Sequence, residues 1–524
     1  MTSEATLVGR RPPPSRRRGP WRGPWPWIVT VLLVYLVVLL DISVHEYGSY
    51  NLSWDFGQAE QAWHLIAHGN LNPYDTLHQH AWWQDHGAFL IWLLAPLYWI
   101  APNDGLTLLV VQDLAIVVAI AAAADWTILF SARRGAAPII TNVCVGTLIA
   151  LCVFNVGLYA TVLYDFHDQV LGTAFLILTG RDVYAGRRRR ALLWGALTLL
   201  SMDLSALNLA ALGVGLALIE RRLRRAGALM ALAGVAWYLG IGLAGGSRGT
   251  TLAYYDRIAG RHLTGGLGDY GAIARGALRH PTRVLHQLNA YRYPLYEDLV
   301  PSGILGLAEP SVVLAILAVI IPGAVSSYGG FIKLGFQNTP AYLLAAVGSS
   351  LVLARVASPP RQPAPEPSTP VTGGRQPRSR TALVVVLAAV TTSFGLACDA
   401  TVAARGGEID FSVSAAAAQQ LAVVRRLTPS GSEVAVPFGV IGRFSGRRYA
   451  YLIHDLPWKL PVATRVVEVI FAPHAGNEWL PGAKIDAAET ALVRLYRAKV
   501  LFAGTQAQAY EVTSIAPGGS ITLP

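Results

Sequence analysis

The sequence predicts a polytopic α-helical membrane protein with a small α/β domain at its C-terminal end. Of its 524 residues, 53% are hydrophobic and only 14% are charged, and the mean hydropathy is +0.42. A chain this apolar is unlike a soluble enzyme, so its core is expected to be spread over many membrane helices. After residue 398 the long apolar runs give way to short ones, which predicts the second domain.

The first membrane helix is predicted from Trp27 to Ile42, where the chain is nearly all apolar. With its flanking residues this run is long enough to cross a hydrocarbon layer of about 30 Å. Six arginines precede it within residues 10–22. The positive-inside rule therefore places the basic tail 1–26 in the cytoplasm and the loop 45–87 outside. A cleaved signal peptide is the alternative, but no small-residue cleavage site follows the run.

The remaining membrane domain is expected to reach residue 357, with about nine to twelve spans in the whole chain at about twenty residues each. Arginine clusters near 133–134, 187–190, 221–225 and 375–380 mark cytoplasmic loops, which leaves 164–169 and 247–300 outside. These clusters also explain the net charge of +11 without a nucleic-acid partner. The apolar segments lie at 88–101, 106–130, 138–163, 170–180, 191–219, 226–246, 303–323 and 338–357.

The C-terminal third begins with a proline-rich polar stretch, 358–381, which is expected to be a disordered cytoplasmic linker. A last membrane helix is predicted at 382–398. Residues 399–524 are then expected to form an extracytoplasmic α/β domain, with strands at 433–436 and 466–471 and a helix at 486–496. The three cysteines lie in or beside apolar runs, so neither a disulfide framework nor a thiolate metal site is expected.

Two carboxylates beside the membrane, Asp55 and Glu60, are the best indication of chemistry in the chain. Apolar residues around them repeat at helical spacing, which predicts an amphipathic helix on the membrane surface with Asp55 near its N-terminus. Capping of that helix and catalysis explain Asp55 equally well.

The same loop is rich in histidine and tryptophan. It lacks a short ligand spacing such as His-Glu-x-x-His, so no metal site is assigned. Tryptophans such as Trp54 stack on sugars, but they also gather at membrane interfaces. The histidines and the acid among them are His64, His68, His78, His80, Asp85 and His86.

Other polar groups interrupt later apolar segments. His167 and Asp168 belong to a polar cluster at 164–168, at a depth where ionisable groups are costly and indicate function. Asp203 is explained by a turn as well as by a function. In the loop 247–300, Arg257 and Arg292 are candidates to bind a phosphate, with surface ion pairs as the alternative.

Several stretches resemble a known family. WDFGQAEQAWHLIAHG, DHGAFLIWLLAPLYWI and LTLLVVQDLAIV resemble the start of the bacterial membrane proteins grouped as domain of unknown function 2079. YDFHDQVLGTAFLILTGRDVYAG and RRLTPSGSEVAVPFGVIGRF continue the resemblance, which covers most of the chain except the N-terminal tail and the linker. That family is similar to the C-type glycosyltransferase superfamily.

The resemblance implies a C-type glycosyltransferase-like fold in the bacterial cytoplasmic membrane. The implied enzyme moves a sugar from a polyprenyl-phosphate donor, among membrane lipids, to an envelope acceptor on the outer face. By position, Asp55 matches the general base, and His167 and Asp168 match a polar group at the same face. The expected substrate-binding residues are Trp54, Glu60, Asp85, His86, Asp203, Arg257 and Arg292.

A phosphate leaving group also needs a cation, either an arginine or a divalent ion such as Mg²⁺ or Mn²⁺. Two non-enzymatic classes stay open beside the transferase: a transporter or lipid flippase, and a structural protein that binds the cell envelope.

Overall fold

The structure is a computed structural model that describes residues 23–102, 104–246, 250–264, 267–327, 335–358, 378–404, 413–453, 458–472 and 482–524. Most of the basic tail and most of the predicted linker at 358–381 lie outside these ranges.

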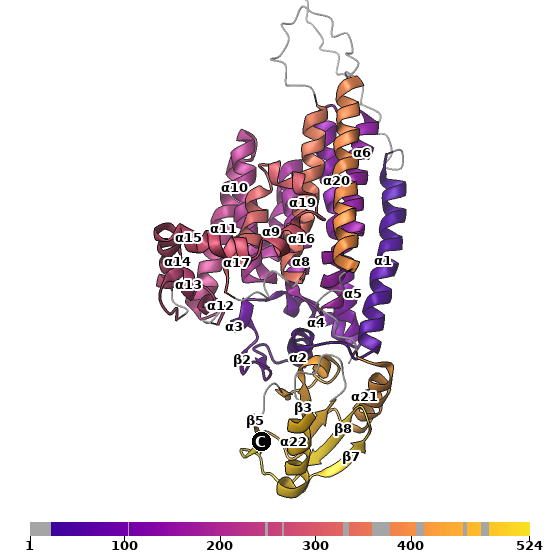
Figure 1. The fold of residues 1–524 in the computed structure, drawn as a ribbon, viewed down its shortest axis with the longest axis vertical. Coiled ribbons are helices and arrows are strands. Elements are labelled where there is room, and N and C mark those ends of the chain that lie inside the picture. The colour runs from indigo at the N-terminus through magenta and orange to yellow at the C-terminus, as the bar shows by residue number, and fades with distance from the viewer. Residues whose placement is uncertain are drawn as a thin grey trace, which may run out of the picture.

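A bundle of apolar helices forms the first part of the chain (Figure 1). By length and composition, five of the described helices are able to cross a membrane. A sixth span results if α6 (Pro138–Val153) and α7 (Val156–Leu163), bent by 41°, are counted as one. The five are α1 (Trp25–Gly48), α5 (Leu106–Arg133), α11 (Arg224–Ala244, preceded by η2, Arg221–Leu223), α19 (Gly335–Ala357) and α20 (Arg378–Ala404).

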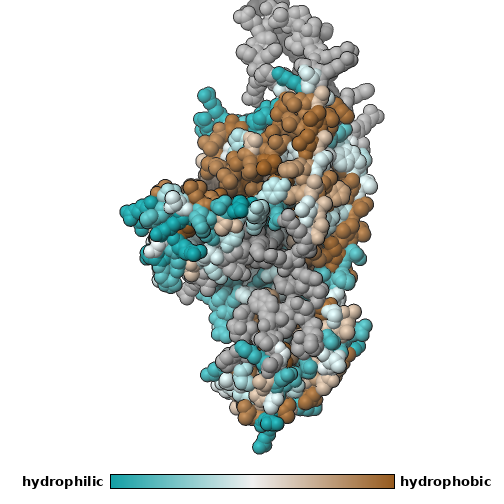
Figure 2. Space-filling model, viewed as in Figure 1, coloured by the Kyte–Doolittle hydropathy of each residue, from teal (hydrophilic) through white to brown (hydrophobic). Residues whose placement is uncertain are grey.

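This number is below the count expected from the sequence because several apolar runs form shorter helices. Each of these is too short or too polar to meet the same criterion alone. They are α4 (Leu90–Ile100), α8 (Asp168–Ala185), α9 (Arg188–Ser201), α10 (Asp203–Ile219) and α17 (Val313–Val325). Figure 2 shows a hydrophobic surface over the bundle, as expected of a surface that faces lipid.

Helices α10 and α11 pack closely because glycines face each other between them. A Cβ atom added at Gly234 would lie 2.3 Å from the backbone oxygen of Ala206, and one at Gly213 would lie 2.5 Å from that of Gly227. Small residues of this kind let membrane helices approach at backbone distance.

Arginines from separate segments gather at one end of the bundle. Arg133 donates a hydrogen bond to the backbone oxygen of Tyr184, and Arg222 lies over the ring of Tyr184 at 5.1 Å. Arg355 lies over the ring of Phe130 at 5.6 Å. The basic loops that the sequence placed on one side are therefore neighbours in space.

The opposite end of the bundle carries the loop after α1. This loop forms α2 (Trp54–Ala67), a short hairpin of β1 (Tyr74–Asp75) and β2 (His80–Ala81), and α3 (Trp83–His86). Four short helices form a lateral helical group with a largely hydrophilic surface (Figures 1 and 2). They are α12 (Thr250–Ala253), α13 (Asp256–Ala259), α14 (Leu267–Arg279) and α15 (Pro281–Ala290). The chain then continues through α16 (Arg292–Leu299) and η3 (Ile304–Ala308), which both pack against α19.

The C-terminal part is a three-layer α/β domain. Its five-stranded sheet has the order β4-β3-β6-β8-β7, in which β3 is parallel to β4 and β6, and β8 is antiparallel to β6 and β7. Alternate residues of β3 face opposite layers: Val434 and Val436 pack in one core with α21, and Ala435 packs in the other with α22. A separate pair, β5 and β9, is antiparallel.

The elements of this domain are α21 (Ala415–Leu427), β3 (Glu433–Pro437), η4 (Phe438–Arg443), β4 (Ala450–Ile453), β5 (Trp458–Pro461), β6 (Val467–Phe471), α22 (Gly482–Tyr496), β7 (Lys499–Ala503), β8 (Gln508–Val512) and β9 (Ser520–Leu523). The two strands and the helix expected from the sequence correspond to β3, β6 and α22.

The α/β domain docks against α2, at the end of the bundle away from the clustered arginines (Figure 1). Gly442 donates a backbone hydrogen bond to Leu52 at 3.0 Å. The guanidinium of Arg443 lies 3.6 Å from the centre of the Tyr47 ring, at the end of α1. Helix α2 is thus held between the membrane bundle and the domain.

Candidate active site

Helix α2 is capped by a residue that lies more than a hundred positions later in the chain. Ser53 occupies the N-cap position, but its side chain does not cap the helix. The carboxylate of Asp165 instead accepts hydrogen bonds from the backbone N–H groups of Ser53 at 2.9 Å and Phe56 at 3.2 Å, and the Ser53 hydroxyl also donates to it. A carboxylate is well suited to the free N–H groups and positive dipole of a helix start.

Asp165 reaches α2 because its backbone adopts a left-handed conformation, with φ of +66°. Aspartate tolerates this region better than most residues. Gln112 of α5 holds the turn on both sides: its side-chain amide donates to the backbone oxygen of Asp165 at 2.8 Å and accepts from the N–H of His167 at 2.8 Å. The loop 164–168 is therefore fixed to both α5 and α2.

Asp55 lies in the first turn of α2, is half-buried, and forms no hydrogen bond or ion pair with any other described residue. The capping role that the sequence allowed for it is filled by Asp165. The pKa of Asp55 is raised to about 7, mainly by burial and also by the neighbouring carboxylates of Asp165 and Asp85, while His78 and His86 act to lower it. An acid with this pKa is suited to accept a proton near neutral pH.

The hairpin and α3 bring histidines and acids next to Asp55. His78 lies 3.4 Å from a carboxylate oxygen of Asp75 and 3.7 Å from one of Asp85, and His86 lies 3.5 Å from Asp85. The ring of Trp54 meets that of His78 edge to face, with 4.4 Å between centres. Burial acts to lower the pKa of His78, but Asp75 and Asp85 raise it above its usual value.

His167 and Asp168 lie at the start of α8, and Asp203 lies at the start of α10. His167 contacts the backbone oxygen of Tyr164 at 2.7 Å, and burial lowers its pKa to about 3, which keeps the ring neutral. Asp168 begins α8, and one of its carboxylate oxygens is buried with no hydrogen-bond partner among the described residues. Asp168 and Asp203 both interact electrostatically with His86, which links them to the group around Asp55.

Three other candidates lie apart from Asp55. The buried carboxylate of Glu60 accepts a hydrogen bond from Ser445 at 2.7 Å and so joins α2 to the α/β domain. Arg257 and Arg292 are exposed in α13 and α16, and their contacts lie within the segment α13–α16. Among the described residues, no hydrogen bond or ion pair connects either arginine with Asp55.

Two shallow apolar cavities lie near α3. One, of about 440 Å³, is lined by Leu71, Asn72, Trp83, Phe89 and Trp92. The other, of about 420 Å³, lies between α9 and α11 and is lined by Leu199, Ala233, Ala236, Trp237, Gly240 and Ile241. Phe89 of the first cavity and Trp237 of the second meet edge to face, with 6.0 Å between their ring centres.

Sequence reasoning did not assign roles to Asp165, Gln112 or His78. Asp165 was visible as a second acid in the cluster 164–168, but Ser53 is itself a favoured cap, so nothing indicated that a distant residue would cap α2. Each strand of the hairpin that groups the histidines is only two residues long, too short for a strand pattern to be recognised in the sequence.

Residues 49–241 match a family described as "Predicted membrane protein (DUF2079)". The resemblance seen in the sequence is confirmed over this segment, which runs from the end of α1 into α11 and contains α2, the hairpin, α3 and the loop 164–168. Together with its apolar helices, the match identifies the chain as a multi-pass membrane protein.

The solved structures that are similar to the chain include two of ArnT from Cupriavidus metallidurans. One is bound to undecaprenyl phosphate and is 10% identical, and the other is in the apo state and is 11% identical. Each alignment covers 94% of this chain and 98% of ArnT, with a TM-score of 0.45. No curated protein matches the sequence.

Proposed function

We propose that the protein is a membrane glycosyltransferase that moves a sugar from a polyprenyl-phosphate donor to an acceptor at the outer face of the bacterial cytoplasmic membrane. The observation that carries the proposal is Asp55: a half-buried acid at the junction of the helix bundle and the α/β domain, with no hydrogen bond or ion pair to any described side chain. Its pKa of about 7 suits a general base.

In the proposed reaction, an acceptor hydroxyl attacks the anomeric carbon of the sugar and gives its proton to Asp55. A bond forms between the acceptor oxygen and that carbon, while the bond to the donor phosphate oxygen breaks. Polyprenyl phosphate leaves with the electron pair of the broken bond. Asp165 caps α2 and so fixes the position of Asp55, while the carboxylate of Asp55 is not used for capping.

The proposed orientation places the clustered arginines in the cytoplasm. Arg133, Arg222 and Arg355 lie together at the end of the bundle opposite Asp55, as the positive-inside rule favours. In this orientation 27–357 is the membrane domain with outer loops 45–87 and 247–300, the tail 1–26 and linker 358–381 are cytoplasmic, 382–398 belongs to the last span, and 399–524 is extracytoplasmic.

The two cavities offer a place for the lipid part of the donor. The cavity between α9 and α11 is almost wholly apolar, as a polyprenyl chain requires. Its neighbour at Phe89 and Trp92 leads to α3, which carries Asp85 and His86. A donor bound along this path keeps its chain against the bundle while its head group lies near Asp55.

The test is transfer from a panel of polyprenyl-phosphate sugars by the full-length protein in lipid nanodiscs. Asp55→Asn keeps the shape of the side chain but removes the base, so turnover is expected to fall about 10²- to 10⁴-fold. Asp104→Asn is the matched control, because Asp104 is exposed and asparagine also caps the start of α5. If the wild type turned over none of the donors, or if Asp55→Asn turned them over as fast as the wild type, the proposal would be contradicted. Either result would favour a transporter or an envelope-binding role.

A further inference from the structure

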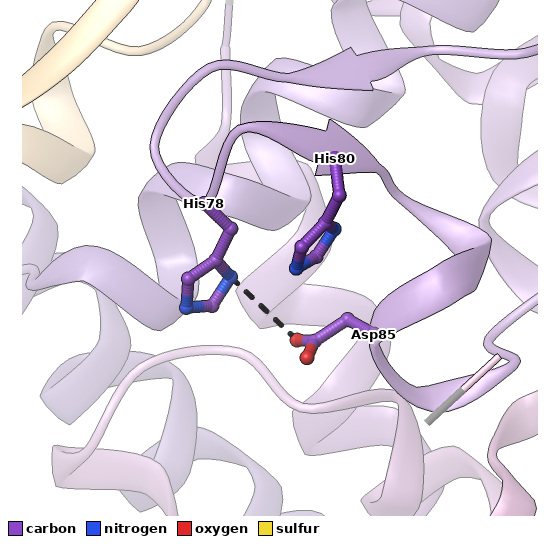
Figure 3. Close-up of side chains that lie close together, drawn as sticks. All are labelled: His78, His80 and Asp85. Carbon is purple, nitrogen blue, oxygen red and sulfur yellow. Dashed lines mark ion pairs between the residues drawn. The ribbon is translucent and has the colours of Figure 1, made fainter. Parts of the chain in front are cut away.

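We propose that His78, His80 and Asp85 bind one divalent transition-metal ion, with Zn²⁺ the best match to their ligand atoms. One ligand atom from each of the three residues lies within 4.8 Å of the others, and all three side chains are half-buried (Figure 3). Metal binding does not depend on the proposed transfer reaction, although the role suggested below for the ion does.

The fold of the hairpin creates this group. Gln79 has a φ of +60°, which turns the chain back so that His80 pairs with Asp75 across the two strands. The rings of His78 and His80 then stack with 5.1 Å between their centres. Helix α3 follows directly and brings Asp85 within 3.7 Å of Nδ1 of His78.

The ligand chemistry favours zinc over the harder ions. Two imidazoles and one carboxylate are a common set for Zn²⁺ sites that keep a fourth position open for water or substrate. Mg²⁺ prefers oxygen ligands and keeps several waters, so it suits this set poorly. Ligand atoms about 2.1 Å from a metal lie closer together than 4.8 Å, so the side chains would draw in slightly on binding.

Residues around the group hold it in place. The side-chain amide of Gln58 donates to Asp75 at 2.7 Å and also contacts Nδ1 of His78. The other oxygen of Asp75 accepts from the backbone of Leu77 at 2.8 Å, within the turn. Metal sites depend on such outer partners to orient their ligands.

The local charge also favours a cation. Asp55, Asp75, Asp85 and Asp165 bring four carboxylates into this small region, and the charged groups that act on Asp55 are two of these acids, Asp165 and Asp85, and the histidines His78 and His86. Neither Arg257 nor Arg292 contacts Asp55 among the described residues. A metal ion at the hairpin would balance these acids and, if the proposed function holds, supply the positive charge that a phosphate leaving group needs.

The experiment measures zinc binding directly. The full-length protein is purified in nanodiscs, its affinity tag is cleaved, and metal is removed with a chelator. Zinc is then added, and bound metal is measured by equilibrium dialysis and mass spectrometry. The wild type is expected to bind about one Zn²⁺ per chain, with Mg²⁺ competing weakly.

Two variants and a control decide the outcome. His80→Ala and Asp85→Asn are each expected to weaken zinc binding by more than the roughly 10- to 100-fold that loss of an outer partner costs. His262→Ala is the matched control, since His262 also faces a carboxylate, Asp256, at 2.8 Å, but lies in the exposed segment after α13. Zinc should raise the unfolding temperature of the wild type and the control but not of His80→Ala.

Equal zinc binding by the wild type and by His80→Ala would overturn the proposed site. The group would then be explained by the ion pairs of His78 with Asp75 and Asp85. An equal loss in His262→Ala would also overturn the site, because the ion would then be held by scattered surface histidines. Without metal, both variants should unfold at the wild-type temperature. For His80→Ala the effect on stability is small because, among the described residues, the ring of His80 hydrogen-bonds only to the backbone of the adjacent Ala81. Zinc binding without sugar transfer would refute the proposed function and leave the metal site intact.

Discussion

The carboxylate of Asp55 is available for chemistry because a neighbouring residue caps the helix in its place. A helix start needs an acceptor for its free N–H groups, and the side chain of the N-cap residue usually supplies it. Here Asp165 meets that need, so the carboxylate of Asp55 remains without a partner among the described residues. The result is a group that loses its proton close to neutral pH.

The rate of transfer is expected to depend on pH through Asp55. In the proposed reaction Asp55 acts as a base when deprotonated, so below its pKa of about 7 the rate should fall by about tenfold per pH unit, and above it the rate should level off. The charged groups that face Asp55 are Asp165, Asp85, His78 and His86. A bound cation would move the midpoint to lower pH, because it favours the charged carboxylate.

The measurement is the pH profile of kcat/KM, with and without chelator. Asp104→Asn should keep the wild-type profile. A rate that falls as pH rises from 5 to 7 would refute the role of Asp55 as a base.

Sequence reasoning reached single residues where their signal was local, and missed them where it was not. Asp55, Asp85 and His86 were selected because they lie in one loop, and the structure brings them together. The contact of Asp165 with α2 depends on how α5 and α8 pack, which no short pattern contains. The grouping of His78 with His80 depends on the left-handed turn at Gln79, a position where glycine or asparagine is the usual signal.

Helices α10 and α11 illustrate a feature at the level of the element. Their close contact depends on glycines, and a larger residue at these positions would push the two helices apart. Hydropathy predicted both apolar runs but did not show which of the glycines in them face a partner. The reason is that these helices are apolar on all sides, so periodicity does not reveal the buried face.

Gly234→Ala is expected to lower thermal stability, because its methyl group would lie 2.3 Å from a backbone oxygen of α10, which cannot move aside as a side chain does. Overpacking of this kind costs about 1–3 kcal/mol. Gly240→Ala, in the same helix, meets no atom within 4 Å and is the control. Unfolding followed by tryptophan fluorescence in detergent compares the two, and equal stability would mean that α10 and α11 separate easily.

The whole molecule consists of an apolar bundle with basic residues at one end and an α/β domain at the other (Figure 1). Sequence reasoning predicted both parts and the grouping of the basic loops, since composition and charge act over long stretches. It did not predict that the domain packs on α2, because that contact joins residues almost four hundred positions apart.

Arg443→Ala is expected to loosen the domain from the end of α1 and the segment that leads into α2. Its guanidinium lies over the rings of Tyr47 and Tyr50 and donates to the backbone of Tyr47, and a cation–π contact that is partly desolvated contributes about 1–2 kcal/mol. Amide hydrogen exchange over residues 47–61 should speed up, while exchange within β3 and β6 should not change. Arg448→Ala is the control, because among the described residues the guanidinium of Arg448 contacts only the adjacent Tyr449 ring. Faster exchange in both variants would contradict the role of Arg443.

Gln112 ties the turn at Asp165 to α5 with one hydrogen bond on either side, and Asp165 in turn holds the start of α2. A tilt of α5 would therefore move the start of α2 as well, because these hydrogen bonds join the two helices through Asp165. The carboxylate of Asp55 would move together with the bundle, so access to it is expected to change when the long helices tilt rather than when a loop opens.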